Sequence, residues 1–284
     1  MRKDLEGNIL IHPSSLSNYQ DCGRRTAVQI FREPIETVVG KERIRKTFPT
    51  IGSVVGNAVH AGVAFMLDRV RCGLDADLPA AVALGWAKYA ADSFDGVQTD
   101  QTTRDTIQAR IQIEKMINVF AHQIVPYDKF ANIEEEMIVH VDGIFYVVGK
   151  PDGRTEYGVI HDHKTGVKLS SYWAQIGGYS VLYASHDIEV SAAQVNFCKR
   201  VKYDKPQPDI EIIPYNLTAA EDAYFDTVER VMRDYEAFSR TNSIAAFPAN
   251  PASFMCSKKY CEAHSTPLCP YGKQTKSTGD EDID

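Results

Sequence analysis

The sequence predicts a mixed α/β protein with a largely helical N-terminal part, a part in which strands and helices alternate, and a cysteine-rich C-terminal segment. Three observations predict this class. Apolar residues recur at helical spacing in the first half, β-rich runs with turn signals begin at Met137, and three of the six cysteines fall between Cys256 and Cys269. Hydrophobic residues make up 44% and charged residues 24% of the chain, which excludes collagen, coiled coils and wholesale disorder.

Helices are expected first. Apolar residues at helical spacing cover residues 14–31, 53–71, 78–94 and 103–125. The first of these segments opens with Pro-Ser-Ser, a helix-start signature, and the last stops at Pro126.

Strands follow. Residues 137–141 and 144–150 flank Asp142-Gly143, a strong signal for a hairpin turn. The remaining β-rich runs are residues 159–164, 194–199 and 211–216. Two more helices are expected at residues 170–184 and 219–240.

Several protein classes are excluded. No stretch approaches the roughly 20 apolar residues of a membrane span, and the N-terminal residues contain no apolar signal region. We therefore expect a cytoplasmic protein without membrane contact. Gly149-Lys150 is followed by proline, so the phosphate-binding loop of an ATP-driven motor is not encoded there.

The net charge of −7 argues against a protein that coats nucleic acid by bulk charge. It does not exclude a protein that binds nucleic acid in a local groove. Part of the acidity lies in the C-terminal GDEDID. The segment from Arg24 to Lys46 is rich in arginine and lysine. A solvated surface and a phosphate-facing patch are both compatible with that segment.

Two carboxylates and a lysine stand where strands are expected. Asp162 and Lys164 alternate along one strand, so their side chains share a face. If the preceding strand pairs with it, Asp152 approaches Asp162. Crowded carboxylates attract a hard divalent ion. A nearby lysine can position or deprotonate a water and can stabilise the charge that develops on a phosphate. Together these groups suit phosphodiester hydrolysis. The alternative is an exposed hairpin with surface ion pairs.

Other polar residues fit the same site. His60 lies mid-helix among apolar neighbours, where it is a metal ligand or a core histidine. Gln175 and Tyr179 share one helix face. The run from Glu134 to Glu136 could supply a further acidic group or form a solvated strand start.

These elements in order resemble the RecB-like branch of the PD-(D/E)XK nuclease superfamily. The matching segments are Gly56 to His60, Gly149 to Asp152, Asp162 to Gly166 and Gln175 to Tyr179, and the opening PSSLSNYQDCGRR is also similar. The resemblance covers roughly residues 12–272. It implies a central mixed sheet flanked by helices.

The resemblance also implies a DNA nuclease that uses one or two Mg²⁺ or Mn²⁺ ions. The ions would be bound by His60, Asp152, Asp162 and the backbone carbonyl of His163. Lys164 matches the catalytic lysine, and Gln175 and Tyr179 match residues that orient the lysine or touch DNA.

The cysteines suggest a second bound group, because disulfides are rare in the cytosol and three cysteines are clustered. Some members of this branch, of the AddB and CRISPR-associated adaptation exonuclease type, carry an iron–sulfur cluster. Cys22, Cys256, Cys261 and Cys269 match its ligand order and imply a 4Fe-4S cluster that joins the two chain ends. The C-x4-C-x7-C spacing is longer than the usual one and Gly23 replaces a common proline, so Zn²⁺ is the alternative.

We therefore expect a metal-dependent DNA exonuclease acting on ends or single strands, with a recombination or helicase partner. The alternatives are a structure-selective endonuclease and a non-catalytic, cluster-stapled DNA-binding module. A single RecB-like nuclease domain is expected over residues 1–272. Its parts are a mainly helical region (12–130), a catalytic sheet with helices (131–240) and the cysteine segment (247–272), followed by an acidic, disordered tail (273–284).

Overall fold

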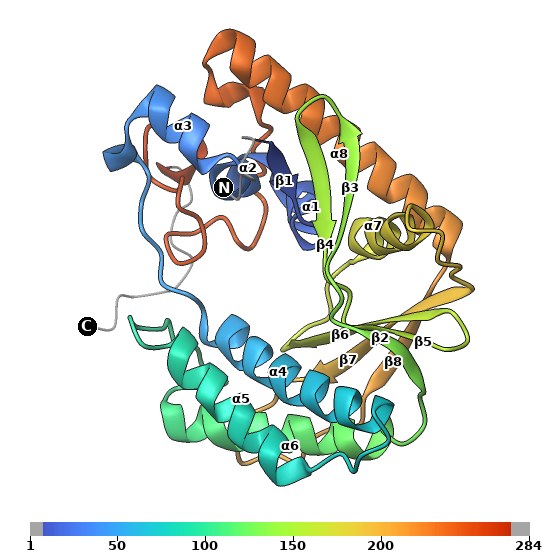
Figure 1. Ribbon diagram of the computed structural model, residues 1–284. Coiled ribbons are helices and arrows are strands. Elements are labelled where there is room, and N and C mark those ends of the chain that lie inside the picture. Colours follow the sequence, from blue (N-terminus) through green and yellow to red (C-terminus); the bar gives the residue numbers. More distant parts are fainter. Residues whose placement is uncertain (1–7, 274–284) are drawn as a thin grey trace.

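The computed structural model describes residues 8–273 and confirms the mixed α/β class (Figure 1). Apart from residue 273, the predicted acidic tail lies outside the described residues. The helices are α1 (Pro13–Asp21), α2 (Gly23–Ile30), α3 (Arg32–Val39), α4 (Ile51–Arg71), α5 (Leu78–Asp92), α6 (Thr106–Gln123), α7 (Trp173–Ala184) and α8 (Leu217–Thr241). The strands are β1 (Ile9–Ile11), β2 (Phe130–Ile133), β3 (Met137–Asp142), β4 (Phe145–Gly149), β5 (Gly153–Thr155), β6 (Val159–Gly166), β7 (Ala192–Lys199) and β8 (Glu211–Tyr215).

Within the described residues the strands form two mixed sheets, a five-stranded one and a three-stranded one beside it. One has the order β1-β4-β3 and the other the order β2-β5-β6-β7-β8. The hairpin β3–β4 does not continue onto β6, because β1 pairs in parallel with β4 on its other side. Instead the short strand β5 pairs antiparallel with β6, and β6 pairs in parallel with β7. The link between β4 and β5 therefore stands where the two sheets meet.

Helices α4, α5 and α6 form one of two hydrophobic cores. Thr50 caps α4 by accepting a hydrogen bond from the backbone N–H of Ser53. Buried apolar side chains, among them Met66, Ile117 and Phe120, fill this core. By length and composition alone α4 could cross a membrane, with a mean hydropathy of 1.3, but 56% of that window is buried. It contacts α5, α6 and β6, as the core helix of a soluble protein does. The cytoplasmic location stays a prediction.

The second core holds α1, β4, α7 and α8 together with the cysteine segment. Its buried side chains include Leu16, Val147, Leu182 and Tyr224. Figure 1 shows α4–α6 on one side of the molecule, the N-terminal helices on another, and the β3–β4 hairpin with α7 and α8 on a third.

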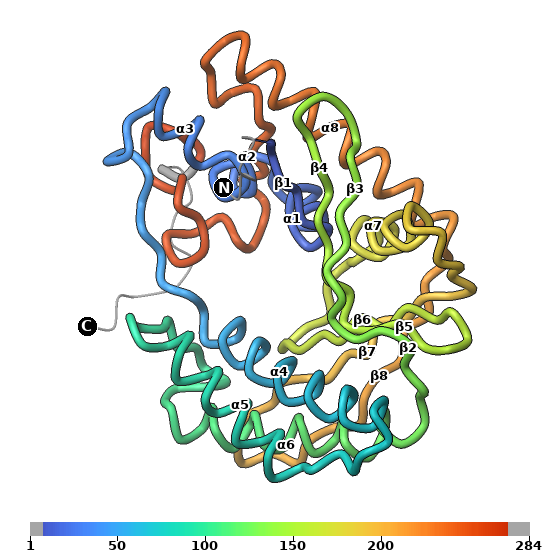
Figure 2. Tube along the Cα trace, viewed as in Figure 1, coloured from blue at the N-terminus to red at the C-terminus, as the bar shows by residue number. Residues whose placement is uncertain are grey.

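The predicted helix over residues 14–31 is wrong as one element, because the chain breaks at Cys22. This residue is extended, with φ −153° and ψ 101°, between α1 and α2. Gly23 lies against the ring of Pro248, where a Cβ would approach ring atoms to 3.0 Å, and the backbone N–H of Arg24 donates to Pro248 O at 2.8 Å. Figure 2 shows the C-terminal segment, in red, beside α2 and α3. Long-range packing thus overrides the local helical spacing and places Cys22 beside the C-terminal cysteines.

Candidate active site

Helix α4 approaches strand β6 closely enough to bring His60 beside acidic residues. Gly56, one turn before His60, lies against Thr165 of β6, where an added Cβ would be 2.7 Å from Thr165 Oγ1. A larger residue at this position would require the Thr165 side chain or the helix to shift. His60 Nδ1 lies 3.1 Å from Asp152 Oδ1. His60 therefore faces a carboxylate and is not a histidine surrounded by apolar side chains.

Asp152 precedes β5 and is held by the neighbouring strand. The backbone N–H of His163 donates to Asp152 Oδ2 at 2.6 Å. The N–H and C=O of one strand residue point toward the same edge, so the His163 carbonyl is on the Asp152 side of β6. The sequence-predicted grouping of these two residues with His60 is thus present, although Asp152 lies between two strands and not at the end of a paired one.

Asp162 and Lys164 share a face of β6, as the alternation predicts. Lys164 Nζ donates to Asp162 Oδ1 at 2.8 Å and also lies 2.8 Å from Oδ2. The Asp162 side chain is 1% exposed and that of Lys164 is 18% exposed. Lys164 Nζ also lies 5.1 Å from the ring centroid of Tyr172, a residue that the sequence analysis missed because no motif singles it out.

Gln175 and Tyr179 come from α7, and of the two Gln175 contacts the Asp162 carboxylate while Tyr179 contacts Gln175. Gln175 Nε2 lies 3.1 Å from Asp162 Oδ1 and 2.9 Å from Tyr179 Oη. Both side chains are buried. Gln175 thus supports Asp162 directly and Tyr179 supports Gln175, while the expected roles of orienting the lysine or touching DNA stay predictions.

In the site, opposite charges stabilise one another and like charges oppose one another. Burial raises the pKa of Asp162 to about 6, with Lys164 opposing and Asp152 adding to the rise. Burial would also raise the pKa of Asp152, but His60, His163 and Lys164 outweigh it and hold that pKa below its ordinary value. Burial disfavours the charged forms of His60 and Lys164, yet the carboxylates raise both pKa values. Two crowded carboxylates thus depend on nearby positive charge.

The donor set fits a hard divalent cation. Asp162 Oδ2 is buried and has Lys164 Nζ, 2.8 Å away, as its ion-pair partner, without a hydrogen bond from any described group, so this oxygen keeps a lone pair for a cation. Two carboxylates, an imidazole and a backbone carbonyl are suitable ligands for Mg²⁺ or Mn²⁺. Among residues 8–273, no three His, Cys, Asp or Glu side chains are already grouped as a metal site. Binding would therefore require side-chain adjustment, because His60 and Lys164 are now the partners of the carboxylates.

Glu134 and Glu135, two of the three glutamates before β3, have side-chain partners outside the site. Glu134 forms an ion pair with Lys150 at 2.6 Å, and Glu135 accepts from Asn132. Neither of these contacts reaches the site. A buried pair that sequence reasoning did not find, His161 with Asn196 at 3.0 Å, supports the opposite face of β6.

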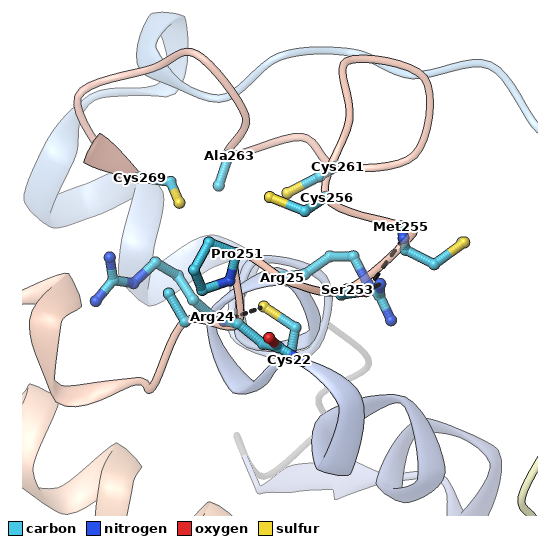
Figure 3. Close-up of a pocket in the computed structure, with 12 residues that line it drawn as sticks. Cys22, Arg24, Arg25, Pro251, Ser253, Met255, Cys256, Cys261, Ala263 and Cys269 are labelled. Atoms are coloured by element: carbon cyan, nitrogen blue, oxygen red, sulfur yellow. Dashed lines mark hydrogen bonds between the residues drawn. The ribbon is translucent and has the colours of Figure 1, made fainter. Parts of the chain in front are cut away.

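A second group of functional candidates lies between α2 and the C-terminal segment. Cys22, Cys256, Cys261 and Cys269 line one cavity of about 10 Å³, close to the room that one water needs (Figure 3). Cys72 and Cys198 do not line it. The structure thus brings together the four cysteines that sequence order had grouped.

The chemistry of these thiols suits a soft metal. Burial raises the pKa of Cys256, and negative charge on Cys269 and Cys22 raises it further. Burial also raises the pKa of Cys261 to about 11. Four thiols at one cavity fit either iron–sulfur or zinc, which bind as thiolates and displace the protons. A single ion needs less room than a cubane cluster, and since no three of these side chains within residues 8–273 are already spaced as ligands of one ion, either group requires the thiols to shift.

No family model matches the chain, and no curated protein matches its sequence. Its fold is similar to the crystal structure of a protein from Eubacterium rectale named as a candidate exonuclease. The TM-score is 0.53 and the identity 12%, over 82% of this chain and 86% of that one. A second solved structure, SSO0001, gives a TM-score of 0.26 at 12% identity over 75% of this chain and 95% of that one, which carries no argument. The first likeness shows a shared mixed α/β fold.

Proposed function

We propose that the chain is a divalent-metal-dependent deoxyribonuclease that acts as an exonuclease on DNA ends or single strands. The observation that carries the proposal is the meeting of Asp152, Asp162, Lys164 and His60 in one partly buried site. The likeness of the fold to a protein named as a candidate exonuclease supports the nuclease part. The motif order that resembles RecB-like nucleases supports the assignment to DNA.

Each side chain has a role that follows from its contacts. His60, Asp152, Asp162 and the His163 carbonyl would hold the ion. When bound, such an ion supplies Lewis acidity toward a phosphoryl oxygen and lowers the pKa of a water. Lys164 keeps its positive charge next to Asp162 and is placed to stabilise charge that develops on a phosphate. Gln175 holds Asp162 in place, and Tyr179 contacts Gln175.

Linear and circular DNA distinguish the candidate activities. End-labelled linear DNA and closed circles, each single- and double-stranded, would be incubated with Mn²⁺. Loss of linear DNA with intact circles is the expected result, and the position of the label gives the polarity. Cleavage of circles would show that the same site acts as a structure-selective endonuclease. If neither is cut, the nuclease proposal is wrong, and the non-catalytic alternative is the one to test by DNA binding.

We further propose that Cys22, Cys256, Cys261 and Cys269 bind a 4Fe-4S cluster, with Zn²⁺ as the alternative. The convergence of the four thiols on one cavity supports a bound metal. The upstream position of Cys22 favours iron, by resemblance to cluster-bearing nucleases, whereas the longer spacing and the small cavity favour zinc. A role in recombination, repair or phage and CRISPR DNA processing, with a helicase partner, is part of the same proposal.

His60→Ala is expected to weaken Mn²⁺ binding about 10-fold or more while changing the melting temperature little. The reason is that His60 contacts Asp152 at a partly exposed position and its ring is not enclosed by apolar side chains. Isothermal titration beside a melting curve measures both effects. His122→Ala, an exposed histidine outside the site, is the matched control. A lower melting temperature with unchanged Mn²⁺ affinity would refute the ligand role.

A further inference from the structure

Two arginines of helix α2 line the cysteine cavity and are almost completely buried. Arg24 is 7% exposed and Arg25 is 6% exposed. Figure 3 shows their side chains running to opposite sides of the cavity, with Cys22 between them and the other three cysteines across from them. The basic segment from Arg24 to Lys46 therefore begins inside the protein, and neither a solvated surface nor a phosphate-facing patch describes these two residues.

The two arginines differ in their partners. Arg25 forms an ion pair with Asp21 at 2.8 Å, so its charge is compensated within α1 and α2. Arg24 donates from Nε to Phe247 O at 3.1 Å and from Nη1 to Leu268 O at 3.4 Å. Within residues 8–273 no carboxylate forms an ion pair with Arg24. Carbonyl dipoles satisfy its N–H groups but do not neutralise its charge.

A buried guanidinium cannot escape this cost by losing a proton, because arginine stays charged in proteins. A buried charge is stable only beside an opposite charge. The groups at the Arg24 cavity that can supply one are the cysteines. Four thiolates around Zn²⁺, or around an oxidised four-iron cluster, carry a net double negative charge. In addition, the backbone N–H of Asn250 donates to Cys22 Sγ at 3.4 Å.

We propose that Arg24 is the buried counter-charge of an anionic metal–thiolate group in this cavity. It acts as a positioning residue: it stabilises the thiolates and so sets how tightly they hold the metal. The inference rests on the proposed metal site, and its chemistry is the same for iron–sulfur and zinc. It also explains why this cation is kept beside groups that, as free thiols, would be neutral.

The test compares three variants of the full chain. Arg24→Met removes the charge but keeps an apolar stem, and Arg24→Lys keeps the charge. Arg32→Met is the control, because Arg32 is paired with Glu36 and Glu262 and does not line the cavity. Zinc-loaded protein is titrated with a chromogenic chelator of known affinity, and melting curves are recorded with and without zinc.

Arg24→Met is expected to weaken zinc binding about 10- to 100-fold, a typical effect of groups that support metal ligands. Arg24→Lys and Arg32→Met are expected to change zinc affinity less than threefold. The melting temperature of Arg24→Met should fall in the zinc-loaded protein and stay level or rise in the metal-free protein, since there the substitution removes an uncompensated charge.

A cluster-loaded sample provides the second arm. Anaerobically reconstituted Arg24→Met should have a lower reduction potential than the parent protein, because losing a positive charge disfavours the more negative, reduced state. A tenfold change in the stability of the reduced cluster relative to the oxidised cluster corresponds to about 59 mV for one electron.

The outcomes separate the two proposals. If the cysteines bind metal and Arg24→Met leaves the metal affinity and the reduction potential unchanged, the counter-charge role is wrong and the metal site stands. An equal fall in melting temperature with and without metal also overturns the counter-charge role, since this would show that Arg24 only ties down the carbonyls of Phe247 and Leu268. A protein that takes up neither iron nor zinc overturns the metal site, and the counter-charge with it.

Discussion

Lys164→Ala is expected to lower the rate of DNA cleavage about 10²- to 10⁴-fold while the fold and Mn²⁺ binding stay largely intact. Lys164 is the more exposed member of its pair with Asp162, and Gln175 still holds Asp162 after the substitution. Single-turnover cleavage of end-labelled linear DNA and calorimetric titration with Mn²⁺ measure the two properties.

The two aspartates should behave differently from the lysine. Asp152→Ala and Asp162→Ala are expected to lose both cleavage and divalent-ion binding, because they remove proposed ligands. Lys150→Ala is the control, since Lys150 pairs with Glu134 outside the site. Near-normal turnover in Lys164→Ala would refute the proposed mechanism, whatever the results for the two aspartate variants.

Cys22→Ser and Cys261→Ser are expected to do equal damage, leaving the protein insoluble or sensitive to protease at both chain ends. A shared metal group ties Cys22, at the junction of α1 and α2, to the C-terminal segment. Binding of a structural metal contributes directly to folding, with about 10–16 kcal/mol for zinc-finger peptides. A whole domain is stable by only about 5–15 kcal/mol, so the loss of one ligand can unfold the region.

Limited proteolysis and metal analysis test this prediction. Cys72→Ser is the control, because Cys72 is exposed at the end of α4 and does not line the cavity. Protein purified without oxygen should be brown, with broad visible absorption and stoichiometric iron. A colourless, stable protein with zinc and no iron would overturn the cluster and leave the nuclease proposal standing. Intact Cys22→Ser beside damaged Cys261→Ser would contradict the shared group.

The sequence by itself determined the elements whose signals are local. Helices α4, α5, α6 and α8 begin and end within a few residues of their predicted bounds, because helical spacing and capping residues act within one or two turns. The alternation along β6 likewise placed Asp162 and Lys164 on one face. The order of the motifs was enough to group His60 with Asp152, although their mutual distance was not predictable.

The tertiary structure decided every feature that depends on contacts between distant residues. Pairing of β1 with β4 created a second sheet, and β1 has only three residues, too few for a periodic signal. Packing of Gly23 against Pro248 broke a segment that reads as one helix. Gln175 reached Asp162, and Arg24 became a buried cation, through the same kind of long-range packing. Local spacing does not encode such contacts, because they gain their free energy from burial and pairing across the whole chain.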